Sequence, residues 1–198
     1  MKHAGFTLVE LLIAITISTV ALGLVTYFAI DLSSFGVDLG NRLETERELE
    51  MTLRSILVEI RSMGPADNGS YDIALANTNA LTFYSDLDGD GKFEQVRYFL
   101  DGTTLKKGVT SSQGTPATYP PANENISETV HFMVPGPAIF TYYGTGDPST
   151  TASLSSPVNI GLIRLVKIRG TTDRDPILPP LPTTLSVTAT IRNLRGDI

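Results

Sequence analysis

The residues best suited to chemistry in this sequence are the carboxylates of one short acidic segment, residues 86–91, which reads Asp-Leu-Asp-Gly-Asp-Gly. This is the D-x-D-x-D-G pattern of the first half of an EF-hand loop, where alternate carboxylates converge on a hard cation and glycine permits a sharp turn. Glu94 falls at position 9 of the pattern, but position 12, normally a bidentate glutamate, is Arg97. The segment therefore predicts a Ca²⁺ site formed by Asp86, Asp88, Asp90 and Glu94, and a plain Asp/Gly turn is the alternative.

Other chemistry is restricted by composition. The 198 residues include no cysteine, no tryptophan and two histidines, so thiolate chemistry, disulfides and cysteine-zinc sites are excluded. His131, in the strand-like run 130–134, is expected to be structural. No phosphate-binding loop, nucleophile elbow, H-E-x-x-H or dinucleotide fingerprint is present. We therefore expect no enzyme and no required cofactor, and the net charge of −6 argues against nucleic acid binding.

The N-terminus carries a basic pentapeptide followed by an apolar run. Met1–Gly5 contains Lys2, and an uncharged stretch extends from Leu11 to Ile30. About 20 such residues in a helix span the hydrocarbon core of a bilayer. Because Lys2 precedes the run and Asp31 follows it, the positive-inside rule places the N-terminus in the cytoplasm and the rest outside.

Glu10 is unusual in this setting, since a carboxylate within an apolar helix is costly without a partner. If the chain is cut after Gly5, Phe6 gains a free amine one helical turn away from Glu10. The amine of one subunit and Glu10 of a neighbour could then neutralise each other.

The segment Gly5-Phe6-Thr7-Leu8-Val9-Glu10 resembles the cleavage and methylation motif of type IV pilins and type II secretion pseudopilins. The resemblance implies that prepilin peptidase cuts between Gly5 and Phe6, that the Phe6 amine is N-methylated, and that Glu10 pairs with the N-terminal amine of a neighbouring subunit. It also implies other pilin subunits, an inner-membrane assembly platform and the membrane itself as partners. The alternative is an ordinary secretory signal peptide, with 21–23 as a small-x-small cleavage site, or an uncleaved anchor.

A second helical segment is expected beyond the membrane. Apolar residues recur at spacings of mostly three or four, and Glu50 and Arg54 stand in the favourable i,i+4 order. Met63-Gly64-Pro65 predicts the helix end. We expect the apolar stripe to enter the core of a domain; its members are Leu32, Phe35, Leu39, Leu43, Leu49, Leu53, Ile56, Leu57 and Ile60.

From residue 71 the pattern changes to short β-rich runs, and Asp101-Gly102 predicts a hairpin. Consecutive hairpins without helices favour an antiparallel sheet, so the expected fold is α+β, with a long N-terminal helix packed on that sheet. The predicted strands are 71–75, 81–85, 93–100, 103–107, 129–134, 138–143, 160–169 and 185–194. The expected organisation is a leader at 1–5, a transmembrane helix at 6–30, its amphipathic continuation at 31–63 and a β-rich domain at 64–198.

The helix end 57–64 and the strands 81–84 and 96–102 resemble PilW- and PulJ-type minor pilins. This resemblance implies a minor pilin or pseudopilin, made as an inner-membrane precursor and then incorporated into a pilus or secretion pseudopilus, or priming it. A membrane-anchored adhesion or binding module with no filament role is the alternative. The sequence leaves open whether such a filament serves twitching, DNA uptake, adhesion or secretion.

Overall fold

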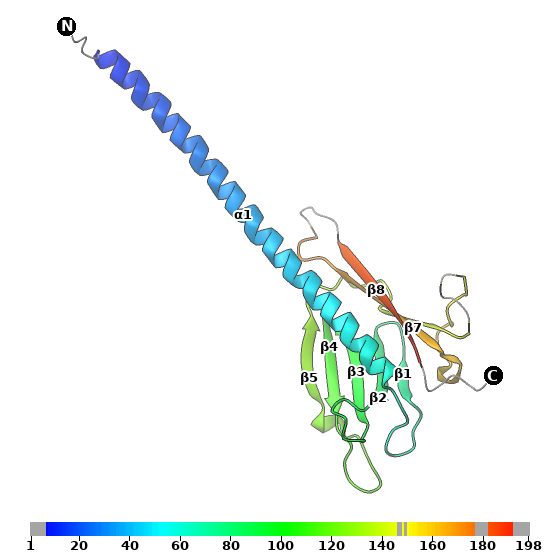
Figure 1. Cartoon of the computed structure of the whole chain (residues 1–198). Coiled ribbons are helices and arrows are strands. Elements are labelled where there is room, and N and C mark those ends of the chain that lie inside the picture. Colours follow the sequence, from blue (N-terminus) through cyan, green and yellow to red (C-terminus); the bar gives the residue numbers. More distant parts are fainter. Residues whose placement is uncertain (1–6, 146–147, 149, 177–181, 192–198) are drawn as a thin grey trace. The chain divides into compact units, whose positions relative to one another are not determined.

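A computed structural model describes residues 7–145, 148, 150–176 and 182–191, without the side chain of Asp38 (Figure 1). The predicted processing residues Gly5 and Phe6 therefore lie outside the described residues. The chain divides into two compact units, Met1–Leu43 and Glu44–Ile198, which are described separately below. Helix α1 extends from Leu8 to Arg61 and contributes to both.

In the first unit, the described residues form the first part of α1. Their side chains are exposed from Leu8 to Val37, including large apolar ones such as Leu12, Val20 and Phe28. The expectation that Leu32, Phe35, Leu39 and Leu43 enter a domain core is wrong, because these four side chains remain 47–65% exposed. The core-facing part of the stripe begins only at Leu49.

In the second unit, the last turns of α1 are amphipathic. Leu49, Leu53, Ile56 and Ile60 are buried, and their spacings of three and four place them on one helical face. The helix ends at Arg61, directly before the predicted stop at Met63-Gly64-Pro65, and Gly64 N–H donates to the Tyr84 carbonyl at 3.1 Å. The predicted end of the helix is therefore confirmed, and the chain joins a sheet directly after it.

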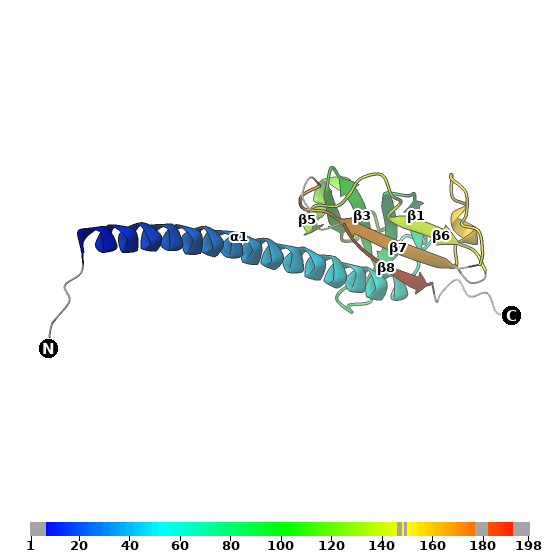
Figure 2. The same ribbon diagram turned by 90° about the horizontal axis from the view of Figure 1, so that it is seen from above.

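The β-strands form two antiparallel sheets. The first has the order β1-β2-β3-β4-β5, and Figure 1 shows these strands side by side. Their bounds are Ile73–Ala76, Ala80–Ser85, Glu94–Asp101, Thr104–Thr110 and Asn125–Val130. The second has the order β6-β7-β8, visible in Figure 2, with bounds Phe140–Tyr143, Leu165–Thr172 and Thr183–Thr190. The predicted α+β class is confirmed, but the sequence did not show that the strands divide between two sheets.

Alternating side chains of both sheets build the core with the helix. In β3, Val96 and Tyr98 point inward and are fully buried, opposite Phe83 and Leu81 of β2. In β7, Val166 and Ile168 are buried in the same way, opposite Ala189 and Val187 of β8. Because burial alternates along these strands, apolar residues recur at every second position, and this pattern predicts strands from the sequence.

Two predicted strands are placed wrongly. The run 129–134 contains only the end of β5, because β5 stops at Val130 and Phe132 has a φ of 58°. A left-handed backbone at Phe132 is incompatible with a strand, so His131 lies in a connection. The run 160–169 begins as a short 3₁₀-helix, Ile160–Leu162, and β7 starts at Leu165. In the run 185–194, residues 192–194 lie outside the described residues.

The predicted hairpin between β3 and β4 is confirmed. Asp101 pairs with Thr104, which leaves Gly102 and Thr103 as a two-residue loop. Gly102 has a φ of 62°, a conformation that glycine adopts without steric cost. The hairpin sets the register that later places Tyr98 opposite Lys107.

Candidate functional site

The start of helix α1 holds Glu10, the residue predicted to act in assembly. Glu10 N–H donates to Thr7 Oγ1 at 3.3 Å, and Thr7 N–H donates to Glu10 Oε2 at 3.4 Å. This reciprocal pair is a capping box, which satisfies two of the free N–H groups at a helix start. The Glu10 carboxylate is therefore directed back toward the N-terminal end of the helix.

The helix that follows suits a lipid environment. Among the described residues, α1 is the one helix long and apolar enough to cross a membrane by length and composition. Polar side chains within it bond to its own backbone: the hydroxyl of Thr16 donates to the Leu12 carbonyl at 3.0 Å, and that of Thr26 to the Leu22 carbonyl at 2.9 Å. A helix satisfies its own backbone hydrogen bonds, which is the main requirement of a membrane span.

The acidic segment forms the loop between β2 and β3, so its flanks are strands, as expected. Ligand-capable oxygens of Asp86, Asp88 and Glu94 lie within 4.8 Å of one another, whereas Asp90 does not belong to this group. The structure therefore brings together three of the four predicted ligands. Asp90 Oδ1 instead accepts the N–H of Lys92 at 2.8 Å.

Backbone donors already organise this loop. Asp86 accepts N–H groups from Gly89 at 2.7 Å and Gly91 at 3.1 Å, and Glu94 Oε2 accepts the Leu87 N–H at 3.1 Å. Burial of Glu94 raises the pKa of its carboxyl, and the nearby charges of Asp88 and Asp90 raise it further. A bound hard cation would reduce the repulsion between these carboxylates. Calcium binding by Asp86, Asp88 and Glu94 stays a prediction.

A second set of contacts, which sequence reasoning missed, fixes the neighbouring loops. Asp67 Oδ1 accepts the Phe93 N–H at 3.0 Å, and its Oδ2 accepts the Ser112 hydroxyl. The Tyr119 hydroxyl donates to the Phe93 carbonyl at 2.8 Å and accepts the Asp67 N–H at 3.1 Å. These hydrogen bonds connect loops that are 26 to 52 residues apart in the sequence. A local sequence pattern therefore could not predict them.

Arg97, which takes the place of the expected bidentate glutamate, has a different role. Its guanidinium donates to both Glu124 oxygens at 2.7 Å and lies 3.9 Å from the centre of the Phe99 ring. Its outward side chain thus secures the long connection 111–124 to the outer face of the first sheet. Arg97 consequently takes no part in the acidic loop.

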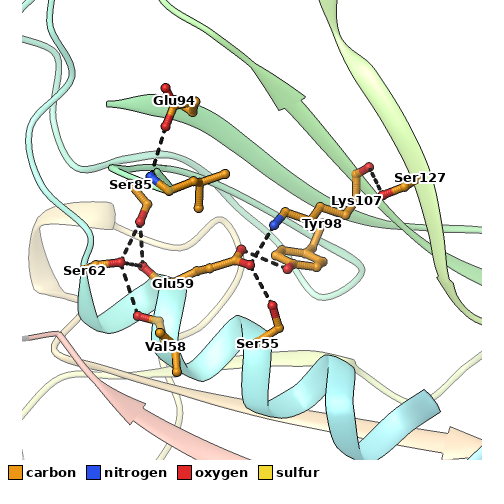
Figure 3. A network of polar contacts seen from close by, with 10 residues as sticks. Ser55, Val58, Glu59, Ser62, Ser85, Glu94, Tyr98, Lys107 and Ser127 are labelled. Atoms are coloured by element: carbon orange, nitrogen blue, oxygen red, sulfur yellow. Dashed lines mark hydrogen bonds and ion pairs between the residues drawn. The ribbon is translucent and has the colours of Figure 1, made fainter. Parts of the chain in front are cut away.

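A mostly buried polar cluster joins α1 to the first sheet and is drawn in Figure 3. Glu59 of α1 accepts hydrogen bonds from Lys107 of β4 at 2.7 Å, from the Tyr98 hydroxyl of β3 at 2.9 Å and from Ser55 at 2.8 Å. Burial raises the pKa of Tyr98, and the charge of Glu59 raises it further, so this phenol donates and does not ionise. The cluster is a mostly buried ion pair whose carboxylate also accepts two hydroxyl hydrogen bonds, which indicates a structural role.

His131 bridges the helix and the sheet edge. Its Nδ1 lies 3.3 Å from Glu48 Oε2 of α1, and its Nε2 lies 3.2 Å from Glu128 Oε2 of β5. The two carboxylates raise the pKa of His131, with Glu48 as the larger cause. With a carboxylate at each ring nitrogen, His131 is a structural link, in accordance with the expectation from its isolation in the sequence.

Comparison with known proteins supports the N-terminal interpretation. Residues 1–26 match the family model described as the prokaryotic N-terminal methylation motif. A search of curated proteins finds no match to the chain. The motif, the apolar helix beginning at Leu8 and the α+β domain define a membrane-anchored precursor. Within that class, the motif supports a type IV pilin-like prepilin, a structural subunit made as a precursor.

Proposed function

We propose that this chain is a minor filament subunit of the type IV pilin or pseudopilin kind. In this proposal, prepilin peptidase cleaves the inner-membrane precursor between Gly5 and Phe6, and the Phe6 amine is methylated. The helix anchors the chain with its N-terminus in the cytoplasm, and the assembly platform then draws it into a pilus or pseudopilus with other pilin subunits. The observation that carries the proposal is the motif over residues 1–26, followed directly by an apolar helix from Leu8.

The position of Glu10 supports its role in assembly. Its carboxylate is turned toward the helix start, where it reaches the Thr7 N–H. In the cleaved chain the new amine would lie at that end, so the same carboxylate could neutralise the amine of a neighbouring subunit. Exchange of lipid contacts for helix–helix packing would favour assembly, and the Glu10–amine pair would select the axial register.

Processing is tested by mass spectrometry of the mature N-terminus. The expected mature chain begins at N-methylated Phe6, and replacing Gly5 with a bulky residue should leave the precursor uncut. A native chain that still begins at Met1, or that begins at Leu24 after ordinary signal cleavage, would overturn the proposal.

The charge of Glu10 is tested separately from its capping bond. Glu10→Gln retains an oxygen that can accept a hydrogen bond but carries no charge, so it cannot form an ion pair with an amine. We expect Glu10→Gln and Glu10→Ala to insert in the membrane normally and to be strongly depleted from sheared filaments. Normal incorporation of Glu10→Gln would show that the hydrogen bond suffices and would refute the ion pair.

A further inference from the structure

Strand β8 forms one edge of the second sheet, whose order is β6-β7-β8 (Figure 2). Its eight residues, Thr183–Thr190, include no charged residue and no proline. All eight pair with β7 without a register shift. A long, regular and uncharged edge is a template for an added strand, and proteins normally protect such edges.

The other three sheet edges among the described strands are protected. In β6, the Phe140 N–H donates to the Thr78 carbonyl at 3.0 Å, and the Tyr142 carbonyl accepts the Leu154 N–H at 2.8 Å. Strand β5 carries the charged Glu128, and its pairing with β4 has a register shift. Strand β1 has only four residues and a register shift of its own. Among the described strands, β8 is therefore the exception.

The register shows which backbone groups of β8 face away from the sheet. Ile191 N–H donates to the Arg164 carbonyl at 3.0 Å, and hydrogen-bonded pairs alternate along an antiparallel ladder. Every second residue back from Ile191 therefore bonds to β7. The residues between them direct their N–H and carbonyl groups to the open edge: Thr184, Ser186, Thr188 and Thr190. No other described residue forms a hydrogen bond with these backbone groups.

The side chains beside this edge are hydroxyls and two cations. On β7, Lys167 lies opposite Thr188, and Arg169 lies opposite Ser186. Ile168 between the cations is fully buried, so both cations project from the outer face of the sheet. Neither cation forms an ion pair with a described residue. The edge thus combines free backbone groups with uncompensated positive charge.

This pattern defines the side chains that suit an added strand. A residue opposite Ser186 would project from the outer face, two strand spacings or about 10 Å from β7. Because Ser186 and Thr188 are short, an acidic side chain there can extend over them toward Arg169 and Lys167. The cations stand two residues apart, and so would the acids. The residue between two acids would face the opposite side, where Val187 packs against the core, and an apolar side chain suits that position.

We propose that the open edge of β8 binds an extended segment of a partner protein as an additional strand, and that acidic and apolar residues alternate in this segment. Its backbone pairs with the free N–H and carbonyl groups of β8, and its acids pair with Lys167 and Arg169. Backbone hydrogen bonds supply affinity in this mode of recognition, and alternate side chains supply specificity. The proposal concerns a binding surface and does not depend on cleavage after Gly5.

Synthetic peptides test this surface on the full chain in detergent micelles. The probe is a short fluorescently labelled peptide in which glutamate and valine alternate, and its binding is measured by fluorescence anisotropy. The control peptide has the same composition with all glutamates at one end, so its net charge is equal. We expect the alternating peptide to bind about tenfold more tightly or better, because only its acids and apolar residues fall on opposite faces of a strand.

Substitutions separate backbone pairing from charge. Ser186→Pro removes an N–H that faces the open edge, where proline is tolerated, so the fold should persist and affinity should fall by about tenfold or more. Ser186→Ala keeps that N–H and should bind like the wild type. Arg169→Glu should weaken binding by about tenfold, whereas Arg54→Glu makes the same exposed charge change on α1 and should have little effect.

Hydrogen exchange reports the geometry without any substitution. In the free chain, the amides of Thr184, Ser186 and Thr188 should exchange fast, whereas those of Leu185 and Val187 should exchange slowly because they bond to β7. The alternating peptide should slow exchange of the first three amides by about tenfold or more. A ligand held by charge alone would leave these amides unprotected.

The outcomes decide between strand addition and its rivals. Equal affinity for the alternating and the block peptide, or no added protection at Ser186 and Thr188, overturns the inference. Displacement of both peptides by a polyuronate, with no preference between them, would show recognition of negative charge alone and would also overturn it. If Ser186→Pro unfolds the chain, hydrogen exchange and Arg169→Glu decide. A chain that is cut before Phe6 and present in filaments keeps the proposed function in every case.

Discussion

Lys107 Nζ lies 2.7 Å from Glu59 Oε1, although 48 residues separate them in the sequence. Both side chains are mostly buried, at 18% and 10% exposure, so this ion pair joins the end of α1 to β4 of the first sheet. A buried pair is costly to break because the remaining charge has no partner. The domain end of the anchoring helix is therefore fixed to the sheet by charge as well as by apolar contacts.

Removing one partner of this pair should destabilise the domain strongly. Lys107→Met leaves the Glu59 carboxylate buried and should lower the free energy of unfolding by about 3–5 kcal/mol. Adding Glu59→Gln removes the stranded charge, and its amide oxygen can still accept from Tyr98, so more than half of the loss should be recovered. Urea unfolding of a soluble fragment from Ser33, followed by tyrosine fluorescence, measures both values. If the losses of unfolding free energy caused by Lys107→Met and Glu59→Gln simply added in the double variant, Glu59 and Lys107 would not be energetically coupled.

Gly170 should be intolerant of any side chain. It lies in β7, and a methyl group there would overlap Leu49 Cδ1 of the buried helix face. We expect Gly170→Ala to cost about 1–3 kcal/mol, since the well-packed core cannot expand freely. In a Leu49→Ala background, where the space is vacated, the same change should cost little.

Gly161→Ala provides the control, because its methyl would meet Asn159 Oδ1 at 3.5 Å, an ordinary contact. It should leave the midpoint of urea unfolding nearly unchanged. Equal effects of Gly161→Ala and Gly170→Ala would show that backbone entropy, and not contact with the helix, decides the result.

The pKa of His131 should be raised above its ordinary value of about 6.5 by Glu48 and Glu128. A raised pKa means that the folded protein binds the proton more tightly than the unfolded chain does. The stabilisation is therefore complete below about pH 6.5 and is lost as the pH rises through the folded pKa. In the fragment from Ser33, His131 is the only histidine, so NMR titration of its ring protons reports the pKa directly.

Glu48→Gln should move this pKa back toward the ordinary value. Glu50→Gln makes the same charge change on the same helix but removes a partner of Arg54, so it should have little effect on His131. A wild-type pKa at or below 6.5 would contradict the two ion pairs.

Calcium should raise the melting temperature of the same fragment if the acidic loop binds it. The structure groups Asp86, Asp88 and Glu94 and leaves Asp90 outside, so Asp88→Asn should abolish the shift and Asp90→Asn should largely preserve it. Binding should weaken as the pH falls, because the raised pKa of Glu94 lets protons compete with the cation. An unchanged melting temperature with millimolar Ca²⁺, or an equal shift in Asp88→Asn, would contradict the predicted calcium site. The segment 86–91 would then be a plain Asp/Gly turn.

The sequence by itself determined the features that depend on neighbouring residues. The motif from Gly5 to Glu10, the apolar run after it, the helix end near Met63 and the turn at Gly102 are all local patterns. Helical and strand periodicities report which face of an element is apolar, so the α+β class was predictable. The same local pattern made Leu32 and Phe35 look identical to Leu49 and Leu53 as core residues.

Only the tertiary structure decided which of these apolar residues have partners. Leu49 is buried because the glycine at position 170 lets β7 approach it, whereas Phe35 has no strand beside it among the residues described in its unit. Tertiary structure likewise divided the strands into two sheets, paired Glu59 with Lys107 and left Asp90 out of the carboxylate group of Asp86, Asp88 and Glu94. These relationships join segments distant in sequence or depend on how a loop closes, and periodicity carries no information about either.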